Sequence, residues 1–87
     1  MKRYRLYTEN KNASEVEQEV SKYFKSFNVS YPTGFWKGER ENSLVIEVIN
    51  DGVNTFSGLG IIATWIKIHN KQQNVLITTE NIEADLI

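Results

Sequence analysis

Few residues in this chain have the types and spacing that catalysis or metal binding requires. Glu39 and Glu41 could act as a general acid and a general base, but the charged turn that contains them shows no burial that would separate their pKa values. His69 is the only histidine, and no nucleophile or second metal ligand lies near it in the sequence. We therefore predict that the protein is not an enzyme and that it has no metal or other cofactor.

Two glycines near the start of the second predicted helix, Gly58 and Gly60, could let an anion approach the helix amides. Each glycine costs a helix about 1 kcal/mol relative to alanine, so each should have a reason to be there. Close packing against a neighbouring element is the commoner reason. We therefore predict a packing role for both residues.

A group of cationic and aromatic residues offers a candidate small-ligand site. Arg3 and Arg5 lie on the first predicted strand, Trp36 lies at the end of the second, and Arg40 lies in the following turn. Arginine beside an aromatic ring can hold a flat anionic group by forked hydrogen bonds and stacking. These four residues form a predicted pocket for a nucleotide-like or amino-acid ligand.

A purely structural interpretation of the two arginines is also open. Antiparallel pairing brings the first predicted strand beside the last. There the arginines can balance Glu80 and Glu83, with Glu47 as a neighbour. Paired in this way, they would stabilise the sheet surface and bind no ligand.

The composition is that of one ordinary globular domain. Of the 87 residues, 40% are hydrophobic and 24% are charged, which favours a packed core over disorder. A formal net charge of −1 gives no basic field for nucleic acid or an anionic membrane. The chain has no cysteine, so disulfides and thiolate chemistry are excluded. Neither a signal peptide nor a run of ~18 apolar residues is found, so we expect a cytoplasmic protein.

Hydrophobic periodicity predicts six elements in the order strand, helix, strand, strand, helix, strand. The predicted strands cover residues 2–8, 29–37, 43–50 and 74–79, and the predicted helices cover residues 13–27 and 54–69. We expect a single domain, 1–87. Residues 80–87 either extend the last strand or form a tail that reaches a partner.

This order is typical of the ferredoxin-like α+β fold, in which a βαββαβ chain forms a four-stranded antiparallel sheet with two helices on one face. Right-handed crossovers place the first and third strands in the middle of that sheet. The longest apolar run, residues 44–49 with only Glu47 interrupting it, falls on a central strand. Pro32 falls on an edge strand, where its missing N–H is tolerated. Both observations agree with this fold.

Polar residues mark the ends of the predicted elements. Asn12 with Glu15 can cap the start of the first helix, and Asn70 can close the second helix in a left-handed conformation. The segment from Gly38 to Asn42 is predicted to be a tight polar turn between the second and third strands.

The second helix has two apolar faces. One set should pack on the sheet and comprises Phe56, Leu59, Ile62, Ala63 and Ile66. At ~100° per residue, Ile61, Trp65 and Ile68 fall on nearly the opposite side. Burying a large apolar side chain is worth roughly 1.5–3 kcal/mol, so this stripe predicts a protein interface anchored by Trp65. Alternatively, residues 80–87 fold back over the stripe, or the helix rotates and covers part of it.

The segment GFWKGERENSLVIEV, residues 34–48, resembles short uncharacterised ferredoxin-like proteins of bacterial and phage genomes. Hallmarks of better-known families with this strand order are missing. The first loop, TENKNASE, lacks the glycines of acylphosphatases, and the third strand lacks the aromatic residues of RNA recognition motifs. For a phage protein, the resemblance implies a small binder of a host component, such as a nuclease or a nucleotide signal of a defence system.

Two functional hypotheses follow. The first is a non-enzymatic module that self-associates as a homodimer or other homo-oligomer and binds a protein partner through the second-helix stripe. The second is a protein that sequesters or senses a small ligand, possessing the cationic and aromatic pocket described above. Neither a membrane nor a nucleic acid is expected as a partner.

Overall fold

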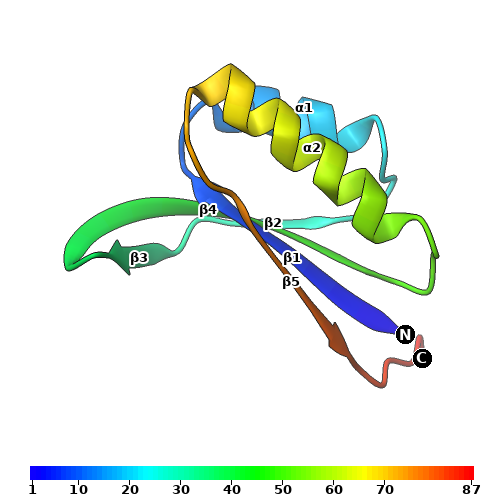
Figure 1. The fold of residues 1–87 in the computed structure, drawn as a ribbon. Helices are drawn as coiled ribbons and strands as arrows, with labels where there is room; N and C mark the ends of the chain where they lie inside the picture. Colours follow the sequence, from blue (N-terminus) through cyan, green and yellow to red (C-terminus); the bar gives the residue numbers. More distant parts are fainter.

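The computed structural model describes residues 1–87 as two helices packed on an antiparallel sheet (Figure 1). The elements are β1 (Lys2–Glu9), α1 (Ala13–Ser21), β2 (Asn28–Ser30), β3 (Thr33–Trp36), β4 (Glu39–Asn50), α2 (Thr55–Asn70) and β5 (Leu76–Asn81). The strand order is β2-β4-β1-β5, and β3 pairs with the first residues of β4. The protein is therefore an α+β protein.

The predicted positions of the central and edge strands are confirmed. β1 and β4 lie in the middle and pair along the whole of β1, while β2 and β5 lie at the edges. Leu44, Ile46 and Val48 are buried on the helix side of β4, and Val45 is buried on the opposite side. The helix side of β4 is therefore covered, and burial of Val45 on the other side fits an apolar run that only Glu47 interrupts.

The sheet has five strands, so the prediction of four was wrong. The single strand predicted for residues 29–37 is split at Tyr31 and Pro32, which belong to neither β2 nor β3. Proline has no N–H to give to the ladder. The Pro32 carbonyl still accepts a hydrogen bond of 2.9 Å from the Ser43 N–H, which holds the break beside β4.

The turn between β3 and β4 is shorter than the predicted polar turn. It consists of Lys37 and Gly38, whose φ angles are 50° and 80°. Two successive positive φ values are typical of the tight hairpin turn whose twist matches that of its strands. The polar residues from Glu39 to Asn42 therefore belong to β4, where they pair with β3.

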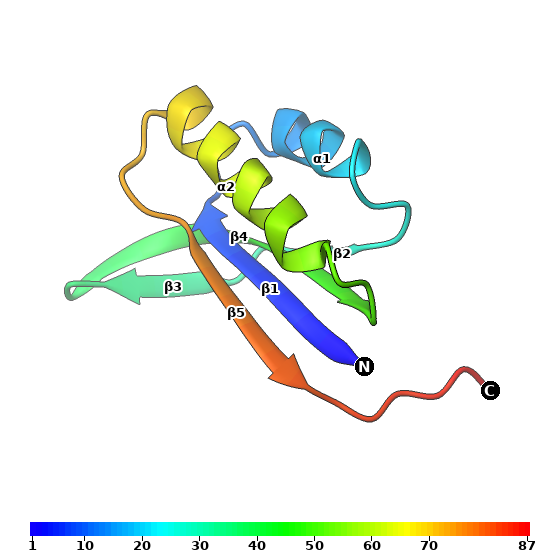
Figure 2. The same cartoon turned by 45° about the vertical axis from the view of Figure 1, so that its right-hand side comes forward.

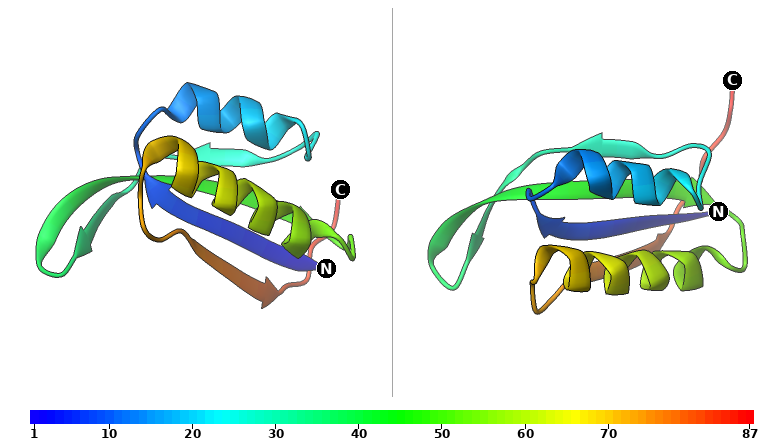
Figure 3. Two further views of the ribbon diagram at one scale, coloured as in Figure 1. Left: turned by 45° about the horizontal axis from the view of Figure 1, so that its top comes forward. Right: turned by 90° about the horizontal axis from the view of Figure 1, so that it is seen from above.

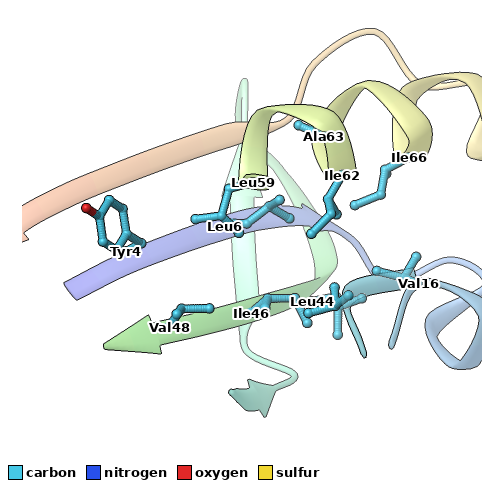
Figure 4. Packing of buried hydrophobic residues seen from close by; sticks show 11 residues of the cluster. Tyr4, Leu6, Val16, Leu44, Ile46, Val48, Leu59, Ile62, Ala63 and Ile66 are labelled. Atoms are coloured by element: carbon cyan, nitrogen blue, oxygen red, sulfur yellow. The ribbon is translucent and has the colours of Figure 1, made fainter. Parts of the chain in front are cut away.

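The core lies between the helices and the central strands (Figure 4). β1 and β4 contribute alternate residues, and each helix contributes one face. Its members are Tyr4, Leu6, Val16, Val20, Leu44, Ile46, Val48, Leu59, Ile62, Ala63 and Ile66. Seen from above, β1 runs between the two helices (Figure 3).

The first helix ends at Ser21, six positions before its predicted end at Phe27 (27 − 21 = 6). Asn12 precedes the helix in the left-handed region, with φ 53°, and its side chain does not cap the helix. Its amide instead donates a hydrogen bond of 2.8 Å to the Asn70 side-chain oxygen. The predicted capping role of Asn12 was therefore wrong, because this long-range contact takes its side chain.

The second helix differs from its prediction at both ends. Thr55 is buried in the first turn and its hydroxyl donates to the Asn50 side-chain oxygen at 2.7 Å, while Phe56 is 56% exposed. Phe56 was therefore wrongly assigned to the sheet-facing set. At the other end Lys71, with φ 55°, takes the left-handed position predicted for Asn70, and Asn70 is buried.

The chain after β5 runs away from the sheet (Figure 2). The Ile82 N–H donates a hydrogen bond of 3.0 Å to the Met1 carbonyl, and beyond it Leu86 and Ile87 are fully exposed. These residues therefore do not fold back over α2.

Candidate functional site

A cleft of about 540 Å³ lies where β1 ends and β4 continues toward β3. Residues of the β3–β4 hairpin and of the loop from Lys71 to Asn74 line it, and both segments lie toward the same end of the sheet (Figure 1). Small-molecule sites in proteins usually have volumes of roughly 300–1,000 Å³. The cleft is therefore large enough for a ligand.

Three aromatic residues line this cleft, and two of them are exposed. Phe35 and Trp36 on β3 are 72% and 59% exposed. Tyr7 on β1 also lines the cleft and lies opposite Leu76 of β5 in the ladder. Exposed aromatic rings next to a hollow offer flat faces on which a planar ligand can stack.

Gly34 allows β3 to approach the floor of the cleft. A Cβ atom at this position would lie 3.0 Å from the Ser43 hydroxyl oxygen, which is closer than ordinary van der Waals contact. Both residues line the cleft. The glycine therefore leaves the Ser43 hydroxyl accessible at the junction of the hairpin and the sheet.

The loop between α2 and β5 is anchored to β1. The Gln72 side-chain amide donates to the buried Thr8 hydroxyl at 2.7 Å and to the Asn74 carbonyl at 3.2 Å. The Gln72 backbone N–H donates to the Lys67 carbonyl at 3.1 Å. These hydrogen bonds fix the loop, so this side of the cleft is formed before any ligand arrives.

Asn70 secures the region behind the loop. Its side chain is 1% exposed, accepts from Asn12 at 2.8 Å and donates to the Lys11 carbonyl at 3.0 Å. Its backbone carbonyl accepts from Lys11 Nζ at 2.8 Å. The end of α2 is thus joined to the loop that precedes α1, and the buried amide is satisfied.

Three charged residues line the cleft: Glu9, Glu41 and Lys71. None of them forms an ion pair or a side-chain hydrogen bond within the chain. Two carboxylates against one ammonium leave a net charge of −1 in the cleft (1 − 2 = −1). These charges are available to a ligand.

The structure does not bring the four residues of the predicted pocket together. Trp36 lines the cleft. Arg3 and Arg5 lie on the sheet face away from the helices, and Arg40 is exposed opposite Phe35 in the hairpin. Of the predicted ligand residues, only Trp36 is part of the cleft.

Arg3 and Arg5 take part in a network with two glutamates. Arg5 Nε donates to Glu47 at 2.9 Å, and Arg3 Nη1 donates to Glu80 at 3.0 Å, with two further contacts of 3.5 Å. The hydrogen bond to Glu47 raises the pKa of Arg5. The two arginines are therefore paired with carboxylates on the sheet surface, as the alternative to ligand binding proposed. Glu80 and Glu47 take part in this pairing, and Glu83 does not.

The predicted interface stripe is only partly exposed. Ile61 and Ile68 are 55% and 76% exposed on α2. Trp65 is half-buried and packs against the core, and its ring stacks on His69 with ring centroids 4.4 Å apart. His69 Nε2 in turn lies 3.0 Å from a carboxylate oxygen of Glu15 on α1. Trp65 therefore faces the junction of the helices more than the solvent.

The other chemical candidates are dispersed. Glu41 lines the cleft, but Glu39 does not. A Cβ atom at Gly58 would lie 3.2 Å from the Phe24 ring, which fits the predicted packing role, whereas Gly60 has no such neighbour. No group of three or more His, Cys, Asp or Glu residues could hold a metal ion. Neither α1 nor α2 has the length and apolar composition of a membrane-spanning helix.

Most of the cleft was not predicted from the sequence. Ser43, Gln72 and Thr8 belong to three segments far apart in the chain and form no motif. The one local signal is the polar run KQQN after α2, residues 71–74, which is longer than closing the helix requires. Only its position beside β1 shows that it lines a cleft.

Comparison with known proteins supports the fold. No protein-family model matches the sequence, and no curated protein matches it. A DUF3240-family protein of Shewanella baltica gives a TM-score of 0.72 at 11% identity, covering 99% of this chain and 93% of that one. A phage SAM lyase in complex with S-methyl-5′-thioadenosine gives 0.69 at 12% identity, covering 91% and 79%.

A third similar structure is CPII, a nitrogen regulatory PII-like protein of Thiomonas intermedia bound to ADP, AMP and bicarbonate. It gives a TM-score of 0.65 at 8% identity, covering 99% of this chain and 93% of that one. At these identities the likeness shows the fold alone. The chain has the ferredoxin-like α+β fold of small bacterial and phage proteins, as its sequence resemblance predicted.

Proposed function

We propose that the protein binds a small adenine-nucleoside ligand in the cleft between the β3–β4 hairpin and the α2–β5 loop. The observation that carries this proposal is the cleft itself, which combines a volume of about 540 Å³ with exposed aromatic rings and free polar groups. Of the similar structures, one holds S-methyl-5′-thioadenosine and another holds ADP and AMP. The cleft of this protein and the ligands of these two similar structures support the same ligand class, an adenine nucleoside.

The lining residues suit the parts of such a ligand. Trp36 and Tyr7 offer rings on which adenine can stack. Ser43, Gln73 and Asn74 offer hydroxyl and amide groups that can donate to or accept from the ribose and the edge of the base. We propose that Gln72 contributes indirectly, because its amide is already bonded to Thr8.

The proposed activity is sequestering or sensing, without turnover of the ligand. We propose that the protein acts in the cytoplasm, the location expected from the sequence, where adenine nucleosides are abundant. Chromatography of S-adenosylmethionine after incubation with the protein tests the absence of turnover. Unchanged substrate is expected, and release of S-methyl-5′-thioadenosine at a rate that scales with protein concentration would contradict it.

A thermal-shift screen tests binding. The panel comprises S-methyl-5′-thioadenosine, S-adenosylmethionine, AMP, ADP, guanosine and free amino acids. A ligand at about 100-fold excess over its dissociation constant adds ~2.7 kcal/mol of stability, and 1 kcal/mol raises Tm by roughly 4–8 °C in a domain of this size. At least one adenine compound should therefore raise Tm by about 10 °C or more.

Matched variants assign that shift to the cleft. Trp36→Ala removes a cleft side chain that is 59% exposed, and Ile68→Ala removes an α2 side chain that is 76% exposed. Both should fold, but only Trp36→Ala should lose the shift. If no adenine compound raises Tm, or if Trp36→Ala keeps the full shift, the proposal is wrong.

A second proposal concerns self-association, because α2 leaves Ile61 and Ile68 exposed on one face. Burial of these side chains against a second copy would remove them from water. Size-exclusion chromatography with light scattering should give a mass above 10.1 kDa for the native chain and about that mass for Ile61→Glu with Ile68→Glu. A native monomer would contradict self-association. The exposed face of α2 would then be left with one proposed role, binding of a different protein.

A further inference from the structure

We infer that the ligand of this cleft has a positive charge beside its flat ring, as a sulfonium nucleoside such as S-adenosylmethionine does. The inference depends on the proposed function, since it specifies the ligand of the same site. It separates two classes of adenine compound: phosphorylated nucleotides, which are anionic, and sulfonium nucleosides, which are cationic at sulfur.

The first argument is the charge of the cleft. Glu9 lies opposite Ser43 in the β1–β4 ladder, and Glu41 lies opposite Gly34 in the hairpin. Glu41 is also two positions before Ser43 on β4, so both carboxylates lie near Ser43 in the cleft, and neither has a cationic partner in the chain. Lys71 is the only cationic side chain that lines the cleft. A phosphate would meet more negative than positive charge, whereas a sulfonium would be attracted.

The second argument is the aromatic lining. The face of an aromatic ring is negative, so it attracts a cation placed above it, and tryptophan does so most strongly. Trp36, Phe35 and Tyr7 line the same cleft as Glu9 and Glu41. Aromatic rings and carboxylates in one cleft suit a weakly hydrated cation such as a sulfonium. A phosphate is an anion, so neither group would attract it.

The third argument is the direction of α2. The helix ends at Asn70, and the next residues, Lys71 to Asn74, line the cleft, so the negative end of the helix dipole lies on this side. Lys11 donates to the Asn70 carbonyl and offsets part of that charge, but Lys11 does not line the cleft. Phosphates bind at the opposite end of helices, where N–H groups are free. α1 begins at Ala13, after the loop that contacts Asn70, but no residue of its first turn lines the cleft.

Calorimetric titration with three probes tests the charge preference. S-adenosylmethionine and S-adenosylhomocysteine differ by one methyl group and one positive charge, and AMP is anionic. S-adenosylmethionine should bind about tenfold or more tightly than S-adenosylhomocysteine, the scale of a desolvated cation–aromatic contact. The preference should shrink as salt is added, because exposed charges are screened.

Two isosteric variants locate the charge that is responsible. Glu41→Gln should lose most of the preference, whereas Glu39→Gln, on the same strand but outside the cleft, should keep it. Equal affinity for the two sulfur compounds, or tighter binding of AMP, would overturn the inference and leave the proposed function in place. If none of the probes binds, the proposed function and this inference are both wrong.

Discussion

The side-chain amide of Gln72 donates a hydrogen bond of 2.7 Å to the buried hydroxyl of Thr8 and so ties the loop after α2 to the end of β1. The two residues are 64 positions apart in the chain. Because Thr8 belongs to β1, which lies between β4 and β5 in the sheet, the loop is positioned by a central strand. One side of the cleft is therefore preorganised, which lowers the entropic cost of binding.

Thr8→Val tests this preorganisation. Valine keeps the shape of threonine but cannot accept the hydrogen bond, so Gln72 and the loop from Lys71 to Asn74 should become mobile. We expect stability to fall by about 1–2 kcal/mol and the affinity for an adenine ligand to fall severalfold. Hydrogen exchange of the loop amides and calorimetric titration measure the two effects. Unchanged exchange in the loop would show that the hydrogen bond does not hold it.

Asn70→Ala should lower stability more than most polar substitutions. The change removes the hydrogen bonds that Asn70 makes with the Asn12 amide and the Lys11 carbonyl, each worth about 0.5–1.5 kcal/mol, at a position that is 1% exposed. Asn42→Ala, at an exposed position of β4, is the control and should change stability by no more than about 0.5 kcal/mol. Urea denaturation compares the two. Equal effects would mean that the Asn70 contacts contribute nothing specific.

Glu47→Gln should weaken the sheet face away from the helices. Glu47 is within 3.5 Å of both Arg3 and Arg5, so the variant removes the charge that both arginines share. These groups are partly exposed, and exposed ion pairs are worth about 0.2–1 kcal/mol, so we expect a loss near the upper end of that range. The loss, measured by urea denaturation, should decrease at high salt. A loss that is independent of salt would point to packing instead of charge.

Stability should depend on pH through the contact between Tyr31 and Glu17. The Tyr31 hydroxyl donates to Glu17 at 2.9 Å, which raises the pKa of Tyr31 above 10.0. The folded protein thus holds this proton more tightly than the unfolded chain. The contribution of the contact is fully present below pH 10.0, the unfolded value, and is lost as the pH rises through the folded pKa.

The Tyr31→Phe variant isolates that contribution. The stability difference between the native chain and the variant should be constant below about pH 9 and should shrink at higher pH. Tyr23→Phe, at an exposed tyrosine without a hydrogen-bond partner, is the control for general alkaline effects. Urea denaturation across this pH range gives the difference. A difference that grows with pH would contradict the predicted sign.

The fold was largely predictable because its signals are local. The alternation of Tyr4 and Leu6 and the apolar run in β4 depend only on which side of a strand is buried. The strand count was not predictable in the same way. Pro32 was recognised as an edge residue, but whether it bends a strand or breaks it depends on how β4 extends beside it. The length of β4 in turn depends on the tight turn before it, in which Lys37 takes a left-handed conformation. Lysine rarely adopts that conformation, so the sequence does not indicate it.

The candidate site was mostly unpredictable because its residues come from separate segments. Trp36 was expected to bind a ligand, and it lines the cleft. Arg3 and Arg5 have the residue types for an anion site, yet their strand neighbours Glu47 and Glu80 are close enough to pair with them. Sequence alone shows which groups could meet a ligand. The register of the strands decides which of them are already paired.

Nuclear magnetic resonance titration of the isotope-labelled protein with S-methyl-5′-thioadenosine tests the central claim most directly, because each backbone amide reports its own surroundings. The largest shift changes should fall in residues 7–9, 34–36, 41–43 and 71–76, the four segments that contribute lining residues to the cleft. Shift changes centred on Arg3, Arg5 and Thr78, or none at a saturating concentration, would contradict ligand binding in this cleft.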